Sequence, residues 1–153
     1  METAELLPRD IRDRASTRGK EYAWRMEDVK VAILAAKRLN LATLGGEIQY
    51  RLPQCIYEMY WFDFDPPEKK TIETWEEYVV RSADDAICRF EAMCNSTCFE
   101  QEGVLSIESV RDAVGKGEKD LSQHLWFVVD FVTEDEYRDL PARVQQSRHR
   151  FQG

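Results

Sequence analysis

The hydrophobic period of the chain changes abruptly near residue 41, and this change constrains the fold more than any other feature. From residue 26 to residue 40, apolar residues recur every three or four positions, which is typical of an amphipathic helix. From residue 42 to residue 52, apolar residues alternate with polar ones, which predicts a strand with one buried and one solvent-facing side. An all-helical fold and an all-strand fold are therefore both excluded.

A second strand is predicted over 56–64, shortly after a break at Pro53. Because the break is so short, the two strands are expected to form an antiparallel hairpin. Apolar side chains alternate onto both faces of the second strand, so we expect it to lie in the centre of the sheet. It ends at Asp65-Pro66-Pro67 because proline cannot continue a hydrogen-bonded ladder.

Two adjacent glycines, Gly45 and Gly46, lie inside the first predicted strand. A phosphate-binding loop would need a longer glycine motif and a helix directly after it, and the sequence has neither. Glycines within an alternating strand instead mark a β-bulge or a close approach of another backbone. We therefore expect an irregular strand here and no nucleotide site.

Two capping boxes mark the beginnings of two helices. Thr74 with Glu77 opens the longer helix, and Thr133 with Glu136 opens a shorter one near the end of the chain. In each box the threonine hydroxyl and the glutamate carboxylate accept hydrogen bonds from backbone N–H groups that the helix leaves unpaired. Both helix starts are therefore predicted from local chemistry alone.

The predicted fold class is α+β, in a single domain that spans residues 1–153. We expect a small, mainly antiparallel sheet with helices packed on it. The predicted strands are 42–52, 56–64 and 125–132, and the predicted helices are 26–40, 74–94 and 134–140. The polar ends of the chain, residues 1–20 and 143–153, are expected to be flexible.

The net charge of -8 narrows the classes of partner. An acidic chain is repelled by nucleic-acid phosphates and by anionic lipid, whereas it associates faster with basic proteins. The first residues lack the basic and apolar segments of a signal peptide, and no apolar run approaches the thickness of a bilayer. We therefore expect a cytoplasmic protein that binds neither nucleic acid nor membrane, with its four cysteines as free thiols.

Side chains that would carry catalysis or hold a cofactor are sparse. The chain has two histidines, His124 and His149, and neither has a recognisable nucleophile and orienting partner. Cys94 and Cys98 lack the second pair of ligands that a structural zinc site needs. We therefore predict no enzyme activity, no cofactor and no metal.

Aromatic and acidic residues are concentrated around the end of the second strand and the start of the long helix. Interface anchors are preferentially tryptophan and tyrosine surrounded by polar groups, and acidic surroundings suit a basic partner. The candidate partner-binding residues are Tyr60, Trp61, Asp63, Asp65, Trp75, Glu76 and Glu77, together with Glu47 of the first strand.

Four short motifs, taken in order with the final strand, resemble a known family. They are Tyr22-Ala23-Trp24, Leu44-Gly45-Gly46-Glu47, Tyr60-Trp61-Phe62 and the helix start Trp75-Glu76-Glu77-Tyr78. With the apolar strand at 125–132, they resemble immunity protein family 40 of bacterial polymorphic toxin systems. The resemblance covers roughly half of the chain.

This resemblance implies a non-enzymatic antidote that binds a cognate toxin in the cytoplasm and blocks its active site or its substrate. Such toxins are frequently nucleases with basic surfaces, which agrees with the acidic charge of this chain. This chain departs from the family at two places, which bears on the toxin that it would bind. The family more often has an aspartate at the position of Glu47, and the segment 94–123 has no match in the family.

Two other functions stay open on the sequence alone. A metal-dependent enzyme would use Asp63 and Asp65 to share a proton or hold a divalent cation, although aspartates before Pro-Pro are also common turn residues. A cytosolic adaptor or regulatory protein would need no catalytic residues at all. A melting midpoint raised by magnesium, manganese or calcium would favour the enzyme.

Overall fold

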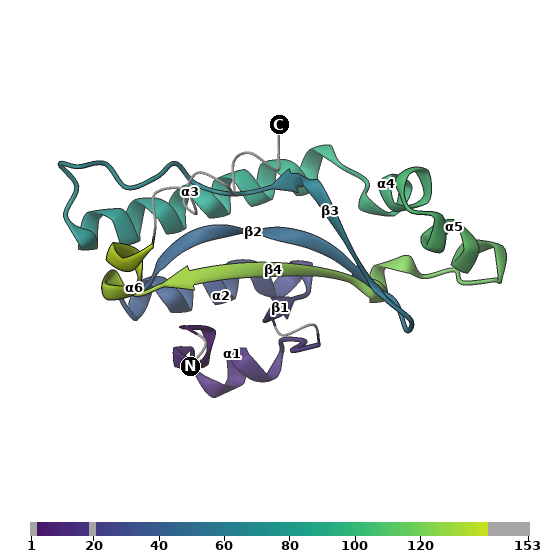
Figure 1. Ribbon diagram of the computed structural model, residues 1–153, viewed down its shortest axis with the longest axis horizontal. Coiled ribbons are helices and arrows are strands. Elements are labelled where there is room, and N and C mark those ends of the chain that lie inside the picture. Colours follow the sequence, from purple (N-terminus) through teal and green to yellow (C-terminus); the bar gives the residue numbers. More distant parts are fainter. Residues whose placement is uncertain (1–2, 19–20, 141–153) are drawn as a thin grey trace.

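A four-stranded antiparallel sheet forms the framework of the protein (Figure 1). The computed structural model describes residues 3–18 and 21–140. The strands are β1 (Ala23–Trp24), β2 (Ala42–Arg51), β3 (Ile56–Asp63) and β4 (Leu125–Val132), and they lie in the order β1-β4-β2-β3. Together with the helices this is an α+β fold, which confirms the predicted class.

Six α-helices accompany the sheet in the described part of the chain, and the three that were predicted are present. The helices are α1 (Arg9–Asp13), α2 (Met26–Arg38), α3 (Trp75–Ser96), α4 (Phe99–Ser106), α5 (Glu108–Gly115) and α6 (Glu134–Asp139). Two 3₁₀ turns, η1 (Thr3–Leu6) and η2 (Leu121–His124), complete the elements. Both capping boxes form as expected, at the starts of α3 and α6.

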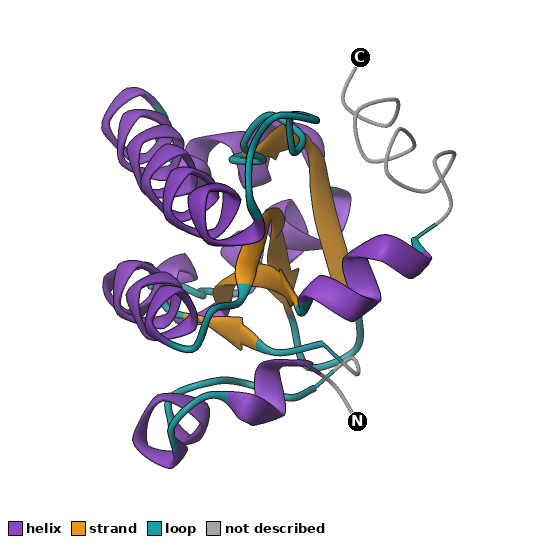
Figure 2. Cartoon of the chain, turned by 90° about the vertical axis from the view of Figure 1, so that its left-hand side faces the viewer, coloured by secondary structure: helices purple, strands orange, loops and turns teal. Residues whose placement is uncertain are grey.

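Helices α2 and α3 lie side by side on one face of the sheet and bury their apolar sides there (Figure 2). Small residues allow the close approach: Ser82 and Ala86 are fully buried in α3. The Ser82 hydroxyl accepts a hydrogen bond of 3.1 Å from the backbone N–H of Thr43 in β2. This contact joins the long helix directly to a central strand.

The hairpin of β2 and β3 is antiparallel as predicted, but the prediction that β3 lies in the centre is wrong. The strand lies at the edge of the sheet, and Tyr57, Glu58 and Tyr60 are exposed. Apolar side chains on both faces of a strand usually indicate burial on both sides. Here Met59 is buried whereas Tyr57 and Tyr60 are exposed, so part of the aromatic content of the strand faces solvent.

The predicted solvent-facing side of β2 is also wrong, because β2 is a central strand with both sides covered. Gln49 and Arg51 are buried. The Arg51 guanidinium donates to the backbone carbonyl of Ser16 at 3.3 Å and to that of Glu21 at 3.2 Å. Hydrogen bonds to the N-terminal segment therefore replace the water that the polar residues were expected to meet.

The N-terminal residues are packed, so the expectation of a flexible end is wrong for residues 3–18. Leu7 and Ile11 are buried in the main core. The indole N–H of Trp24 donates a hydrogen bond of 3.0 Å to the carbonyl of Ile11. The corresponding expectation for 143–153 concerns residues that lie outside the described part of the chain.

Candidate functional site: an acidic groove on helix α3

The first turns of α3 present a row of carboxylates beside a shallow groove of about 700 Å³. The helix begins at its capping box, and its buried side contains Tyr78, Val79 and Ser82. Because a helix repeats every 3.6 residues, the side chains on the other side of α3 face away from the core. The groove is lined by Glu73, Glu76, Glu77, Val80, Arg81, Asp84 and Asp85.

Among the described residues that line the groove, Arg81 is the one basic residue, and its guanidinium is engaged within the protein. Its guanidinium donates to both carboxylate oxygens of Glu73, at 2.6 and 2.9 Å, and to Asp85 at 3.2 Å. It also donates to the carbonyls of Pro67 and Glu68, which fastens the preceding loop to the helix. Lys37, from helix α2, forms an ion pair of 3.0 Å with Asp84, so five carboxylates face two basic side chains and the groove keeps a net negative charge.

The ion pair with Arg81 keeps Glu73 ionised over a wide pH range. The hydrogen bond from Arg81 is the main cause that lowers the pKa of Glu73 from 4.5 to about 2, with a second contribution from the backbone N–H of Lys70. A carboxylate whose pKa is lowered by folding stabilises the folded state at pH values above its ordinary pKa. This stabilisation disappears as the pH falls through the lowered pKa. Glu73 therefore keeps its negative charge through the whole neutral range.

Replacing Glu73 with glutamine is expected to lower the free energy of unfolding at pH 7. The difference from wild type should stay constant down to about pH 5 and then shrink toward pH 2, because wild-type Glu73 becomes protonated there. Urea unfolding at a series of pH values measures this difference. Equal stability of the two proteins at pH 7 would contradict the role given to the ion pair.

The structure brings two of the predicted partner-binding residues, Glu76 and Glu77, into this groove. The prediction is wrong for Trp75 as a surface anchor, because its side chain is buried and its indole N–H donates to the carbonyl of Asn40 at 2.9 Å. Asp65 is also buried, and its carboxylate accepts a hydrogen bond of 3.0 Å from the backbone N–H of Gly46. Both of these residues have structural roles.

The remaining predicted residues lie on the sheet rather than in the groove. Tyr60 and Trp61 belong to β3, and Asp63 pairs with Glu47 of β2 across the two strands. The Asp63 carboxylate accepts a hydrogen bond from the backbone N–H of Asp65 at 3.0 Å. The loop that follows β3 connects this region to the start of α3 (Figure 1), so the predicted residues do not form one continuous surface.

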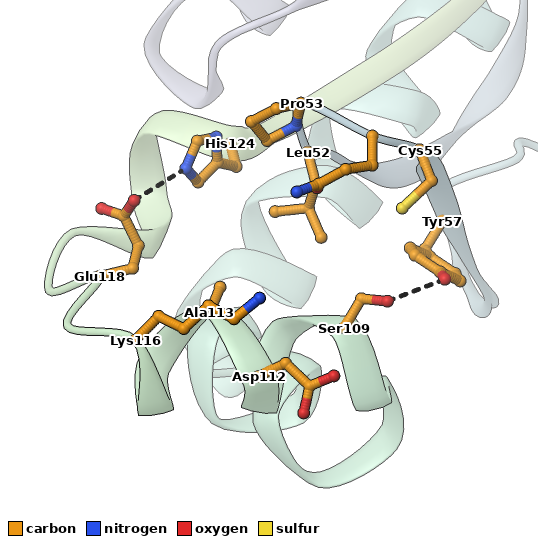
Figure 3. Close-up of a pocket in the computed structure, with 11 residues that line it drawn as sticks. Leu52, Pro53, Cys55, Tyr57, Ser109, Asp112, Ala113, Lys116, Glu118 and His124 are labelled. Carbon is orange, nitrogen blue, oxygen red and sulfur yellow. Dashed lines mark hydrogen bonds and ion pairs between the residues drawn. The ribbon is translucent and has the colours of Figure 1, made fainter.

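A pocket of about 510 Å³ at the opposite end of the molecule was not predicted (Figure 3). Helix α5, the β2–β3 turn and the start of β3 form its walls, and a hydrogen bond of 2.9 Å joins the hydroxyls of Tyr57 in β3 and Ser109 in α5. His124 Nε2 lies 3.5 Å from a carboxylate oxygen of Glu118. The lining residues are Leu52, Pro53, Gln54, Cys55, Tyr57, Ser109, Asp112, Ala113, Lys116, Glu118 and His124.

The thiol and the imidazole among the described residues that line this pocket lie apart. Figure 3 shows Cys55 and His124 on opposite sides of Leu52. The four cysteines are free thiols, as expected, and burial raises the pKa of Cys94 to about 11, so that its thiol stays protonated. Two stretches that are distant in the sequence, 52–57 and 109–124, build the pocket, which explains why no local sequence pattern indicated it.

Within residues 3–18 and 21–140, no group of three or more His, Cys, Asp or Glu side chains is arranged to hold a metal ion. None of the helices in the described part of the chain is long and apolar enough to cross a bilayer. Comparison with protein-family models, with curated proteins and with solved structures finds no match for this chain.

Proposed function

We propose that this protein is an antidote that binds a basic toxin in the cytoplasm and blocks it. The observation that carries the proposal is the acidic groove on α3, which five carboxylates line and whose one arginine is already paired with Glu73 and Asp85. A negative surface of this kind attracts a positively charged protein over a distance of about 10 Å at moderate salt. It would occupy the basic surface with which a nuclease holds phosphate.

Exposed aliphatic residues within the acidic surface support a protein partner over a small ion. Val80, on the wall of the groove, is 46% exposed, and Ile72, directly before Glu73, is 91% exposed. Protein interfaces combine an apolar centre with a polar rim, whereas a cation site needs oxygen ligands alone. The groove has the composition of the former.

The resemblance of the four sequence motifs to an immunity protein family supports the same conclusion from a separate direction. In such systems the antidote gene lies directly beside the toxin gene, and the toxin is the C-terminal domain of a larger protein. We refer below to the C-terminal domain encoded by the adjacent gene as the toxin domain.

Co-expression with the toxin domain tests the proposal. The toxin domain alone is expected to stop growth of a host cell, and the present chain is expected to restore it and to co-purify with the domain as a 1:1 complex. A complex too weak to detect at about 10 μM, or growth that is not restored, would refute the proposal.

A further inference from the structure

Strand β3 contains a large bulge at its centre. Glu58 pairs with Gln49 and Asp63 pairs with Glu47, so the four residues 59–62 lie opposite Ile48 alone. Bulges of this kind occur at sheet edges, where they bend the strand and turn side chains toward a new direction. The bulge also interrupts the regular edge to which another strand would add.

The bulge presents Tyr60 to solvent on a rigid support. The side chain of Tyr60 is 59% exposed, which is unusual for a large aromatic residue in a strand. Its ring lies 5.2 Å from that of Trp61 at an angle of 87°, so the two rings form a corner. Trp61 contacts Phe62 at 5.9 Å, and Phe62 contacts Phe99 in the core at 5.6 Å.

This chain of ring contacts determines what the corner can do. An exposed aromatic side chain that is already held in place loses little conformational entropy when a partner binds it. Tyrosine and tryptophan held in this way are typical of the few residues that carry most of an interface's binding energy. The corner between Tyr60 and Trp61 therefore has the properties of an interface anchor.

The charges of the strand that carries the corner indicate which kind of side chain would occupy it. Strand β3 contains two acidic residues and no basic residue. The Glu58 carboxylate is held by a hydrogen bond of 2.8 Å from the side-chain amide of Gln49, which leaves its negative charge in place. In the described part of the chain, neither Glu58 nor Asp63 forms an ion pair with a lysine or an arginine.

We propose that the corner between Tyr60 and Trp61 receives an arginine side chain of the toxin domain. A guanidinium group is planar, stacks on aromatic rings and donates hydrogen bonds to a carboxylate at the same time. Lysine offers the charge without the plane, and an aliphatic side chain would offer no positive charge to complement the acidic strand. This inference rests on the proposed function and adds a second contact, separate from the groove on α3.

Dissociation kinetics of the toxin-domain complex test the inference. Tyr60→Ala is expected to raise the dissociation rate by about 10- to 30-fold and to leave the association rate unchanged, because an anchor acts after the encounter. Tyr60→Phe keeps the ring and is expected to behave like wild type. Leu105→Ala, at a residue of α4 that is 74% exposed, is the matched control and is also expected to have no effect.

Double-mutant cycles then identify the residue that is bound. Each surface arginine of the toxin domain is changed to alanine and combined with Tyr60→Ala and with Leu105→Ala. One arginine is expected to show a coupling of about 5-fold or more with Tyr60 and none with Leu105. Full-length protein is used throughout, and an unchanged melting midpoint shows that each variant is folded.

The possible outcomes separate this inference from the proposed function. If wild-type protein does not bind the toxin domain, the proposed function and this inference are both refuted. If wild-type protein binds and the Tyr60→Ala variant dissociates no faster than wild type, Tyr60 is not an interface anchor, whereas the proposed function stands. If Tyr60→Ala dissociates faster but couples to no arginine, the anchor does not receive a guanidinium group and the inference is overturned.

Discussion

Replacing Gly46 with alanine is expected to lower the free energy of unfolding by more than about 3 kcal/mol. A Cβ atom on Gly46 would lie 1.8 Å from the backbone carbonyl oxygen of Val128 and 2.6 Å from the ring of Phe64. Val128 belongs to β4, the central neighbour of β2, so its carbonyl cannot move without breaking the ladder. The two central strands would have to separate.

Gly45 is expected to be equally intolerant, for a partly different reason. Its backbone has a φ of +114°, which side chains other than glycine rarely adopt. A Cβ atom here would lie 2.0 Å from the carboxylate of Asp65 and 2.5 Å from its Cα atom. The carboxylate of Asp65 would then lose its place beside the backbone N–H of Gly46.

Urea unfolding of three single variants checks this account. Gly115→Ala is the control, because no atom lies within 4 Å of the added methyl group and the residue ends helix α5. It is expected to leave stability unchanged or to raise it by up to about 1 kcal/mol. If Gly46→Ala unfolds within 1 kcal/mol of wild type, the close approach of β4 is not as described.

Reversing two charges in the groove is expected to slow association with the toxin domain by about 10- to 100-fold at low salt. Glu76→Lys with Asp84→Lys is the suitable pair. Glu76 has no structural partner among the described residues, and Asp84 forms only an exposed ion pair with Lys37. Glu77 is left unchanged because its carboxylate accepts a hydrogen bond from the backbone N–H of Thr74 in the capping box.

A charge-matched control separates the groove from net charge. Glu100→Lys with Asp112→Lys makes the same change on α4 and α5, at the other end of the molecule (Figure 1). Association rates are compared at ionic strengths of about 10 and 150 mM, where the Debye length is about 30 and 8 Å. The groove variant should lose most of the salt dependence, and the control should keep it. Equal association rates for the two variants would show that the groove does not steer association.

The sequence predicted those parts of the fold that local chemistry determines. The capping boxes at Thr74 and Thr133 needed only a threonine and a glutamate three residues later. The irregularity at Gly45 followed from the conformational freedom of glycine, and the short break at Pro53 indicated the hairpin. None of these depends on which element lies next to which.

The position of each strand in the sheet could not be predicted in the same way. The apolar residues on both faces of β3 suggested a central strand, yet burial depends on neighbours that a strand's own sequence does not specify. The same limit explains β2, whose polar residue Arg51 is covered by backbone carbonyls from residues 16 and 21. A polar side chain can be buried in a strand when hydrogen-bond partners within the protein replace water.

The candidate site was predicted only in part, for related reasons. Glu76 and Glu77 follow the outward side of an amphipathic helix, which the sequence shows directly. Trp75, their neighbour, is oriented inward by the same helical period and was placed wrongly because aromatic content alone does not distinguish a core residue from an anchor. The pocket beside α5 depends on packing between distant segments and had no local signal.

Titration of the toxin domain's activity with this protein tests the central claim most directly. The toxin domain is held at a fixed concentration well above the dissociation constant of the complex, and its remaining activity is measured as the acidic chain is added. If the protein acts by occupying its partner, activity falls in a straight line and reaches zero at a molar ratio of one. Activity that persists at a large excess, or that is abolished by a small fraction of an equivalent, would contradict a stoichiometric binding protein.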